Sequence, residues 1–154
     1  MDAVEAEFVE FARTIEPGLR VALVAAHGVE RGREATNDAL VYAWSHWERV
    51  RSLDNPGGYL FRVGQRKARR RRLTPRIPWD GAANDGNPWV EPRLSQALNA
   101  LSPRQRQVVI LIESYEWTQR EVAELLGIGL SSVQTHLERG LERLRAALRV
   151  SDHG

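Results

Sequence analysis

The chain has 154 residues, enough for one domain or two small ones, and its 42% apolar and 27% charged residues exclude a disordered protein. The lack of cysteine excludes disulfides and thiolate metal sites, and the four histidines are too scattered to indicate a metal cluster. An acidic N-terminus without a long apolar run predicts no signal peptide and no membrane insertion, so a cytoplasmic protein is expected. The net charge is only +2, but residues 62–76 contain eight basic residues and no acid.

The first half of the chain contains several stretches with helical apolar periodicity. They span residues 4–15, 19–26, 34–47 and 59–72. Pro17 and Gly18 are predicted to end the first helix, because both residues interrupt helices. Trp44 and Trp47 lie on the apolar stripe of the third stretch and are predicted to pack in the core. The fourth stretch follows the turn sequence at residues 55–58 and finishes as almost pure arginine.

The composition changes abruptly at residues 73–93, which hold four prolines and two glycines among Asp and Asn residues. Such a density of helix breakers predicts a linker. A short helix is expected at residues 94–101, and Ser102 followed by Pro103 is typical of the start of another helix. The chain is therefore predicted to be all-α, with two small helical domains joined by a Pro/Gly-containing linker. The expected boundaries are 1–72, 73–93 and 94–150.

The clearest motif is a short helix, a tight turn and a longer helix near the C-terminus. Thr118 and Glu121 have the spacing of a capping box, and Gly127 suits the left-handed residue that ends a helix. Ser131 or Ser132 is predicted to cap the longer helix. Apolar residues recur along it at spacings of three and four: Val133, Leu137, Leu141, Leu144 and Leu148. This arrangement predicts a helix-turn-helix, whose second helix can lie in a DNA major groove.

The outward face of the longer helix carries side chains of middling size that form hydrogen bonds and suit base edges and phosphates. They are Ser131, Ser132, Gln134, Thr135, His136, Glu138 and Arg139. The alternative is an ordinary helical hairpin whose leucines form only a core.

The C-terminal motif and parts of the first half resemble a known family, the bacterial RNA polymerase sigma factors and especially their extracytoplasmic-function group. LSPRQRQVV and TQREVAELLGIGLSSVQTHLERGLERLRAAL, within residues 98–148, resemble the fourth region of these proteins. Nine positions agree with the family pattern: Glu121, Ala123, Leu126, Gly127, Val133, Leu137, Arg139, Leu144 and Arg145. REATNDALVYAW resembles the polymerase-binding helix of the family, and residues 57–63 resemble the start of its promoter-melting helix.

The resemblance implies a promoter-specificity (sigma) subunit that binds core RNA polymerase and promoter DNA and directs transcription initiation. Implied contacts to the upstream promoter element are Arg120, Ser131, Ser132, Gln134, Thr135, His136 and Arg139. Implied contacts to phosphate and the downstream element are Tyr59, Arg62, Arg66, Lys67, Arg69, Arg70, Arg71 and Arg72. Glu34, Asn37, Asp38 and Tyr42 are the implied polymerase-binding residues. An anti-sigma factor is a further candidate partner.

The sequence departs from the family at three of these positions. Gln134 stands where a basic residue is common, Arg66 where an asparagine is common, and Arg70 where an acid is common. The first difference implies another specificity at the upstream element, and the other two imply altered DNA melting and altered readout of the downstream element.

Two other functions are compatible with the sequence. Residues 133–137 also resemble the recognition helix of quorum-type response regulators, so a helix-turn-helix regulator that does not act as a sigma subunit is one alternative. A protein-only adaptor is the other. An enzyme is not expected and no cofactor is implied, because the sequence has no Gly-rich phosphate loop, metal-ligand set or paired nucleophile and base.

Overall fold

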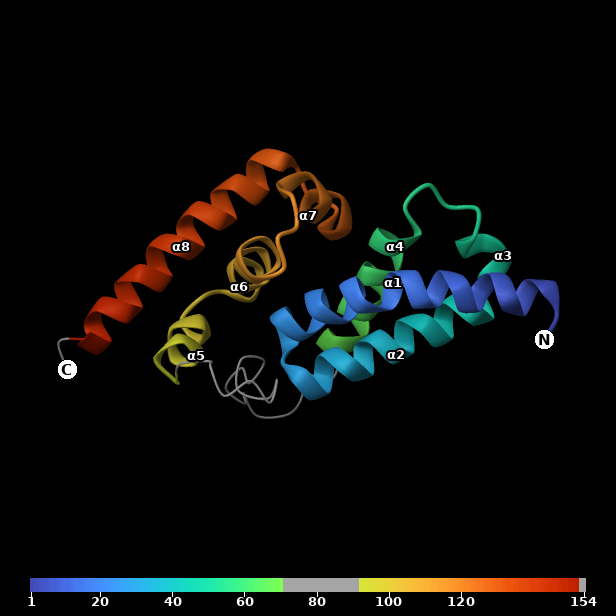
Figure 1. The fold of residues 1–154 in the computed structure, drawn as a ribbon, viewed down its shortest axis with the longest axis horizontal. Helices are drawn as coiled ribbons and strands as arrows, with labels where there is room; N and C mark the ends of the chain where they lie inside the picture. Colours follow the sequence, from blue (N-terminus) through green and yellow to red (C-terminus); the bar gives the residue numbers. More distant parts are fainter. Residues whose placement is uncertain (71–91, 153–154) are drawn as a thin grey trace.

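The structure, a computed structural model, describes residues 1–70 and 92–152, and every regular element in these ranges is helical (Figure 1). The elements are α1 (Ala3–His27), α2 (Val29–Ser45), α3 (Trp47–Val50), α4 (Pro56–Arg70), α5 (Pro92–Asn99), α6 (Pro103–Val109), the π-helical turn η1 (Ile110–Ser114), α7 (Gln119–Leu126) and α8 (Leu130–Asp152). The prediction of an all-α protein is confirmed. Arg71, Arg72 and the predicted linker up to residue 91 lie outside the described residues.

Helix α1 is continuous, so the predicted break at Pro17 and Gly18 is wrong. Pro17 lies on the exposed side of α1, where water can bind the carbonyl of Arg13 that a proline leaves without its helical partner. Gly18 has a packing role instead, because a Cβ at this position would lie 2.8 Å from Cζ2 of Trp117. Both residues are thus compatible with a helix of 25 residues.

The N-terminal half (residues 1–70) is built on α1 and α2, which run side by side, with α4 packed against both (Figure 1). Small alanines and the buried Leu19 and Leu23 form the middle of its core. Trp47 is only 6% exposed, as predicted for a core residue, and lies 5.0 Å from the ring of Phe11. The same prediction for Trp44 is wrong, because 44% of it is exposed and its ring packs at 5.0 Å on Phe8 at the edge of this core.

In the C-terminal half (residues 92–152), α5, α6 and α7 pack against the long helix α8, and η1 follows α6 and contacts α7 (Figure 1). Ser102 and Gln105 form a capping box at the start of α6, which confirms the start predicted from Ser102 and Pro103. Helices α7 and α8 are held together by Val122, Leu126 and Val133, all buried.

The two halves pack directly on each other, and their buried side chains belong to one hydrophobic cluster. The Arg106 guanidinium donates from Nε to the Ala25 carbonyl at 2.8 Å and from Nη2 to the Ala26 carbonyl at 2.9 Å. Gln107 Nε2 donates to the Ala22 carbonyl at 2.8 Å. These bonds tie α6 to the last turns of α1. Burial lowers the pKa of Arg106 to about 10, because a charged group loses water there.

Candidate nucleic-acid interface

Helix α7 and the turn after it form as the sequence predicts. Thr118 Oγ1 accepts a hydrogen bond from the Glu121 amide, and Glu121 Oε1 accepts one from the Thr118 amide, both at 3.1 Å. Gly127 has a φ of 67°, a left-handed conformation that a side chain disfavours, and its amide donates to the Ala123 carbonyl at 2.9 Å. The helix-turn-helix prediction is therefore confirmed by local geometry on both sides of the turn.

Helix α8 begins at Leu130, so the prediction that Ser131 or Ser132 caps it is wrong. Both serines lie in the first turn of α8, and both are exposed. Val133, on the opposite side, is fully buried and fixes the rotation of this turn against α7. The orientation of the polar side chains therefore follows from an apolar contact.

The predicted upstream-element residues lie together on the outer side of α7 and the first half of α8. All of them are exposed except His136, which is partly buried. Gln134 and Thr135 offer both donors and acceptors, and Arg139 adds a guanidinium, a combination suited to base edges in a major groove. Whether these residues contact DNA remains a prediction.

The positive charge of Arg104, a residue that was not predicted to belong to this surface, acts on His136. The pKa of His136 is lowered, first by burial and then by the positive charges of Arg104 and Arg139. Arg104, in the first turn of α6, has its own pKa lowered by burial and by Arg69 of α4. Its Nη1 atom is buried without a hydrogen-bond partner among the described residues. The alternating RQRQ sequence gave no signal of this position, because it does not show which side of α6 faces α8.

The basic residues of α4 form the second predicted DNA surface. Arg62, Arg66, Lys67, Arg69 and Arg70 are exposed, and within the described parts of the chain no ion pair joins them to an acid. Tyr59 at the start of α4 is partly buried. Guanidinium groups at this density suit phosphate oxygens, whose recognition does not depend on base sequence.

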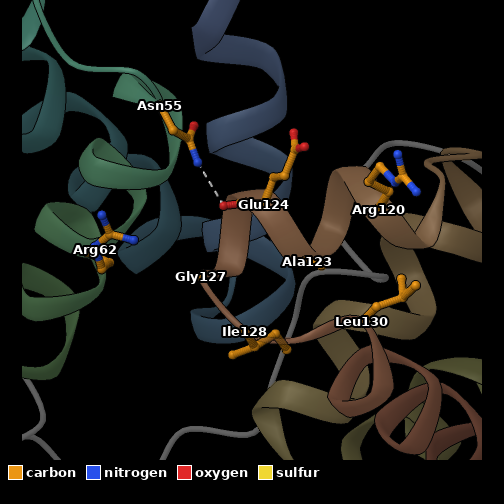
Figure 2. Close-up of a pocket in the computed structure, with 8 residues that line it drawn as sticks. All are labelled: Asn55, Arg62, Arg120, Ala123, Glu124, Gly127, Ile128 and Leu130. Carbon is orange, nitrogen blue, oxygen red and sulfur yellow. Dashed lines mark hydrogen bonds between the residues drawn. The ribbon is translucent and has the colours of Figure 1, made fainter.

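The two predicted DNA surfaces meet at a hollow between α4 and α7 (Figure 2). This open cavity of about 420 Å³ is lined by Asn55, Arg62, Arg120, Ala123, Glu124, Gly127, Ile128 and Leu130. Asn55 Nδ2 donates to the Glu124 carbonyl at 2.9 Å, the dashed line in Figure 2. A Cβ at Gly127 would lie 2.9 Å from Nη1 of Arg62. Arg62 and Arg120, predicted for different promoter elements, thus line the same hollow.

The predicted polymerase-binding residues all lie on α2, but they differ in their surroundings. Asn37 is exposed, whereas Glu34, Asp38 and Tyr42 are partly buried. The Tyr42 hydroxyl lies 2.9 Å from the hydroxyl of Tyr59, a predicted DNA contact on α4. This hydrogen bond is the main cause that raises the pKa of Tyr42.

Two further properties of the described residues concern metal ions and membranes. Within residues 1–70 and 92–152, no group of three or more histidine and acidic side chains could hold a metal ion. Across the same ranges, the helices are too short or too polar to cross a membrane.

Comparison with known proteins gives matches at the level of sequence and fold. Residues 92–144 match the family described as Sigma-70, region 4. The RNA polymerase sigma-E factor of Streptomyces avermitilis is 29% identical, with 95% of this chain and 87% of that protein aligned. The sigma-E factor of Streptomyces coelicolor is 28% identical, with 95% and 88% aligned. The sigma factor RpoE of Bartonella quintana, solved with the anti-sigma factor NepR, has a similar fold, with a TM-score of 0.68, 20% identity, and 94% and 98% of the two chains covered.

Proposed function

Since the chain is an RNA polymerase sigma factor of the extracytoplasmic-function group, we infer that it binds core RNA polymerase and directs it to promoters. The observation that carries this function is the polar face of α8. It is exposed on one side and fixed by the buried Val133 on the other, within the residues that match sigma region 4. In this proposal the chain supplies promoter specificity, and none of its residues is given a catalytic role.

We propose that α7 and α8 place their exposed face in the major groove of the upstream promoter element. Gln134 and Arg139 would contact base edges, since amide and guanidinium groups form paired hydrogen bonds there. Arg120, Ser131, Ser132 and Thr135 would bind the flanking phosphates and bases, and His136 would stand at the edge of this face. Gln134, where the family commonly has a basic residue, is proposed to change which base is preferred.

Helix α4 is proposed to hold the downstream element mainly through phosphates. Arg66 and Arg70 replace residues of different chemistry in the family pattern, and they raise the positive charge of an already basic helix. Contacts of this kind weaken steeply as salt increases. Arg71 and Arg72, which lie outside the described residues, are proposed to contact phosphate as well.

Core polymerase is proposed to bind α2 through Glu34, Asn37 and Asp38. The proposed domain boundaries stay at 1–72 and 94–150, with a linker between them. A cytoplasmic location follows from binding polymerase. An anti-sigma factor is a candidate regulator, since RpoE of Bartonella quintana was solved in complex with one.

Transcription in vitro tests the proposal, with core polymerase and this chain alone on a library of genomic fragments. Discrete start sites that depend on the chain are expected, and Asp38→Arg should lower initiation at all of them by weakening polymerase binding. Asp54→Arg, the same charge reversal at an exposed residue away from α2, is the control. Selective DNA binding without polymerase binding would instead indicate a separate helix-turn-helix regulator, and polymerase binding without DNA affinity an adaptor.

A further inference from the structure

Basic residues from three helices come together where the two halves of the chain meet. Helix α4 of the N-terminal half contributes one of them, α6 contributes another, and α8 contributes two. The positive charge of the residue on α4 acts on the one on α6, whose charge acts in turn on the histidine of α8. We call this group the junction cluster; its members are Arg69, Arg104, His136 and Arg139.

The close approach of α8 to α6 brings two members of the cluster together. A Cβ at Gly140 would lie 2.7 Å from Cγ2 of Val109 and 3.4 Å from the carbonyl oxygen of Gln105, so α8 packs directly on the backbone of α6. His136 precedes Gly140 by one turn on the same side of α8, and Arg104 precedes Gln105 in α6. The helix contact therefore places the imidazole of α8 near the guanidinium of α6.

The guanidinium of Arg104 lacks a counter-charge. Its Nη1 atom is buried, and the described residues offer it no hydrogen-bond partner. Burial and the positive charge of Arg69 both lower the pKa of Arg104, because each disfavours the charged form. In residues 1–70 and 92–152, no ion pair joins Arg69, Arg104 or Arg139 to an acid. An anion at the junction cluster would thus remove a repulsion that the protein itself leaves uncompensated.

The composition of the junction cluster suits phosphate groups. Guanidinium groups bind phosphate oxygens through paired hydrogen bonds, and an imidazole adds a further donor. A phosphate group carries about −1.5 to −2 charge at pH 7, so a chain of two or three phosphates balances three guanidinium groups better than a single carboxylate does. Arg69 and Arg139 are exposed, and Arg104 and His136 are partly buried, so the cluster is open to solvent on one side.

We propose that the junction cluster binds a small free polyphosphate, such as the di- or triphosphate of a nucleotide. Such a ligand joins the two halves, because Arg69 belongs to one half and the other members belong to the other. It also occupies Arg69, His136 and Arg139, which are proposed to contact DNA, so it competes with promoter binding. This competition rests on the proposed function. Arg104 lies outside the proposed DNA contacts and therefore distinguishes the polyphosphate site from them.

Calorimetric titration of the full chain with inorganic tripolyphosphate, at constant ionic strength, tests the site directly. The native chain should bind this probe at a single site. Arg104→Gln should weaken binding at least about tenfold, since a hydrogen bond between two charged groups is lost. Arg145→Gln, the same change at an exposed arginine of α8 outside the cluster, is the matched control and should leave the affinity nearly unaltered.

Thermal melting separates a binding role of Arg104 from a structural one. Without ligand, Arg104→Gln should melt at the same temperature as the native chain or higher, because the variant removes a buried charge without a counter-charge. Tripolyphosphate should raise the melting temperature of the native chain and have little effect on the variant. A residue with only a structural role would instead lower the melting temperature when it is replaced, with or without the probe.

Competition with promoter duplex, followed by fluorescence anisotropy, measures the consequence for DNA binding. Tripolyphosphate should displace the duplex from the native chain, and sodium chloride at equal ionic strength should displace less of it. Arg104→Gln should bind the duplex as the native chain does, but displacement should require about tenfold more tripolyphosphate.

Three results would overturn the site. The first is equal affinity of Arg104→Gln and the native chain for tripolyphosphate, and the second is an equal loss in Arg145→Gln, which would show attraction to net charge alone. The third is a loss of duplex binding in Arg104→Gln as large as its loss of tripolyphosphate binding, which would make the ligand a phosphate of the DNA backbone. Failure of the proposed function is a separate outcome, because the calorimetric titration requires neither DNA nor polymerase.

Discussion

Helices α4 and α8 carry the two predicted DNA surfaces, and they differ in both charge and support. In residues 62–70 of α4, five of nine side chains are basic and none is acidic. The exposed first half of α8 has mostly neutral groups that form hydrogen bonds, with Arg139 as its only arginine. Dense charge attracts any phosphate backbone, whereas spaced donors and acceptors distinguish bases. If both surfaces bind DNA as proposed, we expect affinity to come largely from α4 and selectivity from α8.

This division of roles makes different demands on packing. A salt-dependent contact tolerates some movement, but a base contact requires side chains placed to within a fraction of an ångström. Helix α8 meets that requirement through the fully buried Val133 and through the capped and glycine-ended helix α7. Variants in α4 and α8 can therefore separate the two roles.

Val133→Asp should have the largest effect. It places a carboxylate with no partner in a site with 0% exposure, which should cost more than about 3 kcal/mol of folding free energy. Selective promoter binding should be lost, while weak binding to all sequences through α4 persists. Thermal denaturation and competition between promoter and random duplex measure both effects. Gln134→Asp, the same change of charge at the exposed neighbour, should leave stability nearly unaltered, and retained selectivity in Val133→Asp would contradict the comparison.

Replacing Arg69 and Arg70 together with glutamine should weaken binding to every duplex alike. Each phosphate contact contributes about 0.9 to the log–log salt slope, so the loss of affinity between about 50 and 200 mM salt should be roughly tenfold smaller than for the native chain. Fluorescence anisotropy at several salt concentrations measures this. The same double change at Arg145 and Arg149, exposed near the end of α8, is the control. A loss confined to one promoter sequence would show that α4 reads bases.

Gln134→Ala should reduce selectivity without changing the salt slope. The loss of one amide contact to a base edge corresponds to about 1 kcal/mol of discrimination, roughly a fivefold change in the ratio of promoter to random binding. A panel of promoters with single base changes should locate the loss at one position. If all sequences lose affinity equally, Gln134 does not read a base.

The smallest effect concerns pH. The pKa of His136 is lowered by burial and by Arg104 and Arg139, so between its ordinary and its lowered value the unfolded chain binds a proton that the folded chain does not. Stability should therefore fall as the pH falls through that window and then level off below the lowered pKa. His136→Gln should remove this part of the pH dependence in thermal melts. An unchanged profile would show that another group titrates there.

The features of this fold that are predictable from the sequence are those whose stabilising contacts are local in the chain. The capping box of Thr118 and Glu121 and the left-handed Gly127 were predictable, because each involves residues within four positions of one another. The helix end predicted at Pro17 and Gly18 is absent, and the contact that explains Gly18 comes from Trp117, about a hundred residues later in the chain. No sequence pattern predicts that two residues so far apart, such as Gly18 and Trp117, are in contact.

For the candidate site too, residues placed by local contacts were predictable, and residues placed by contacts between distant helices were not. Exposure of Gln134 and Arg139 followed from helical periodicity alone, since Val133 and Leu137 fix the buried side. Arg104 was missed because its relation to His136 and Arg69 exists only once α6, α8 and α4 are assembled. The pairing of Tyr42 with Tyr59 likewise joins two helices that the sequence treats separately.

The side-chain amide of Asn55 forms two hydrogen bonds, one within its own half of the chain and one to α7. Its Oδ1 accepts from the Gly58 amide at 3.0 Å and so secures the first turn of α4, while its Nδ2 reaches the Glu124 carbonyl on α7. If α7 moved away from α4, only the second bond would break. The helix that carries the arginines would keep its beginning intact, so undocking need not begin to unwind it. The start of α4 therefore does not depend on α7 staying in place.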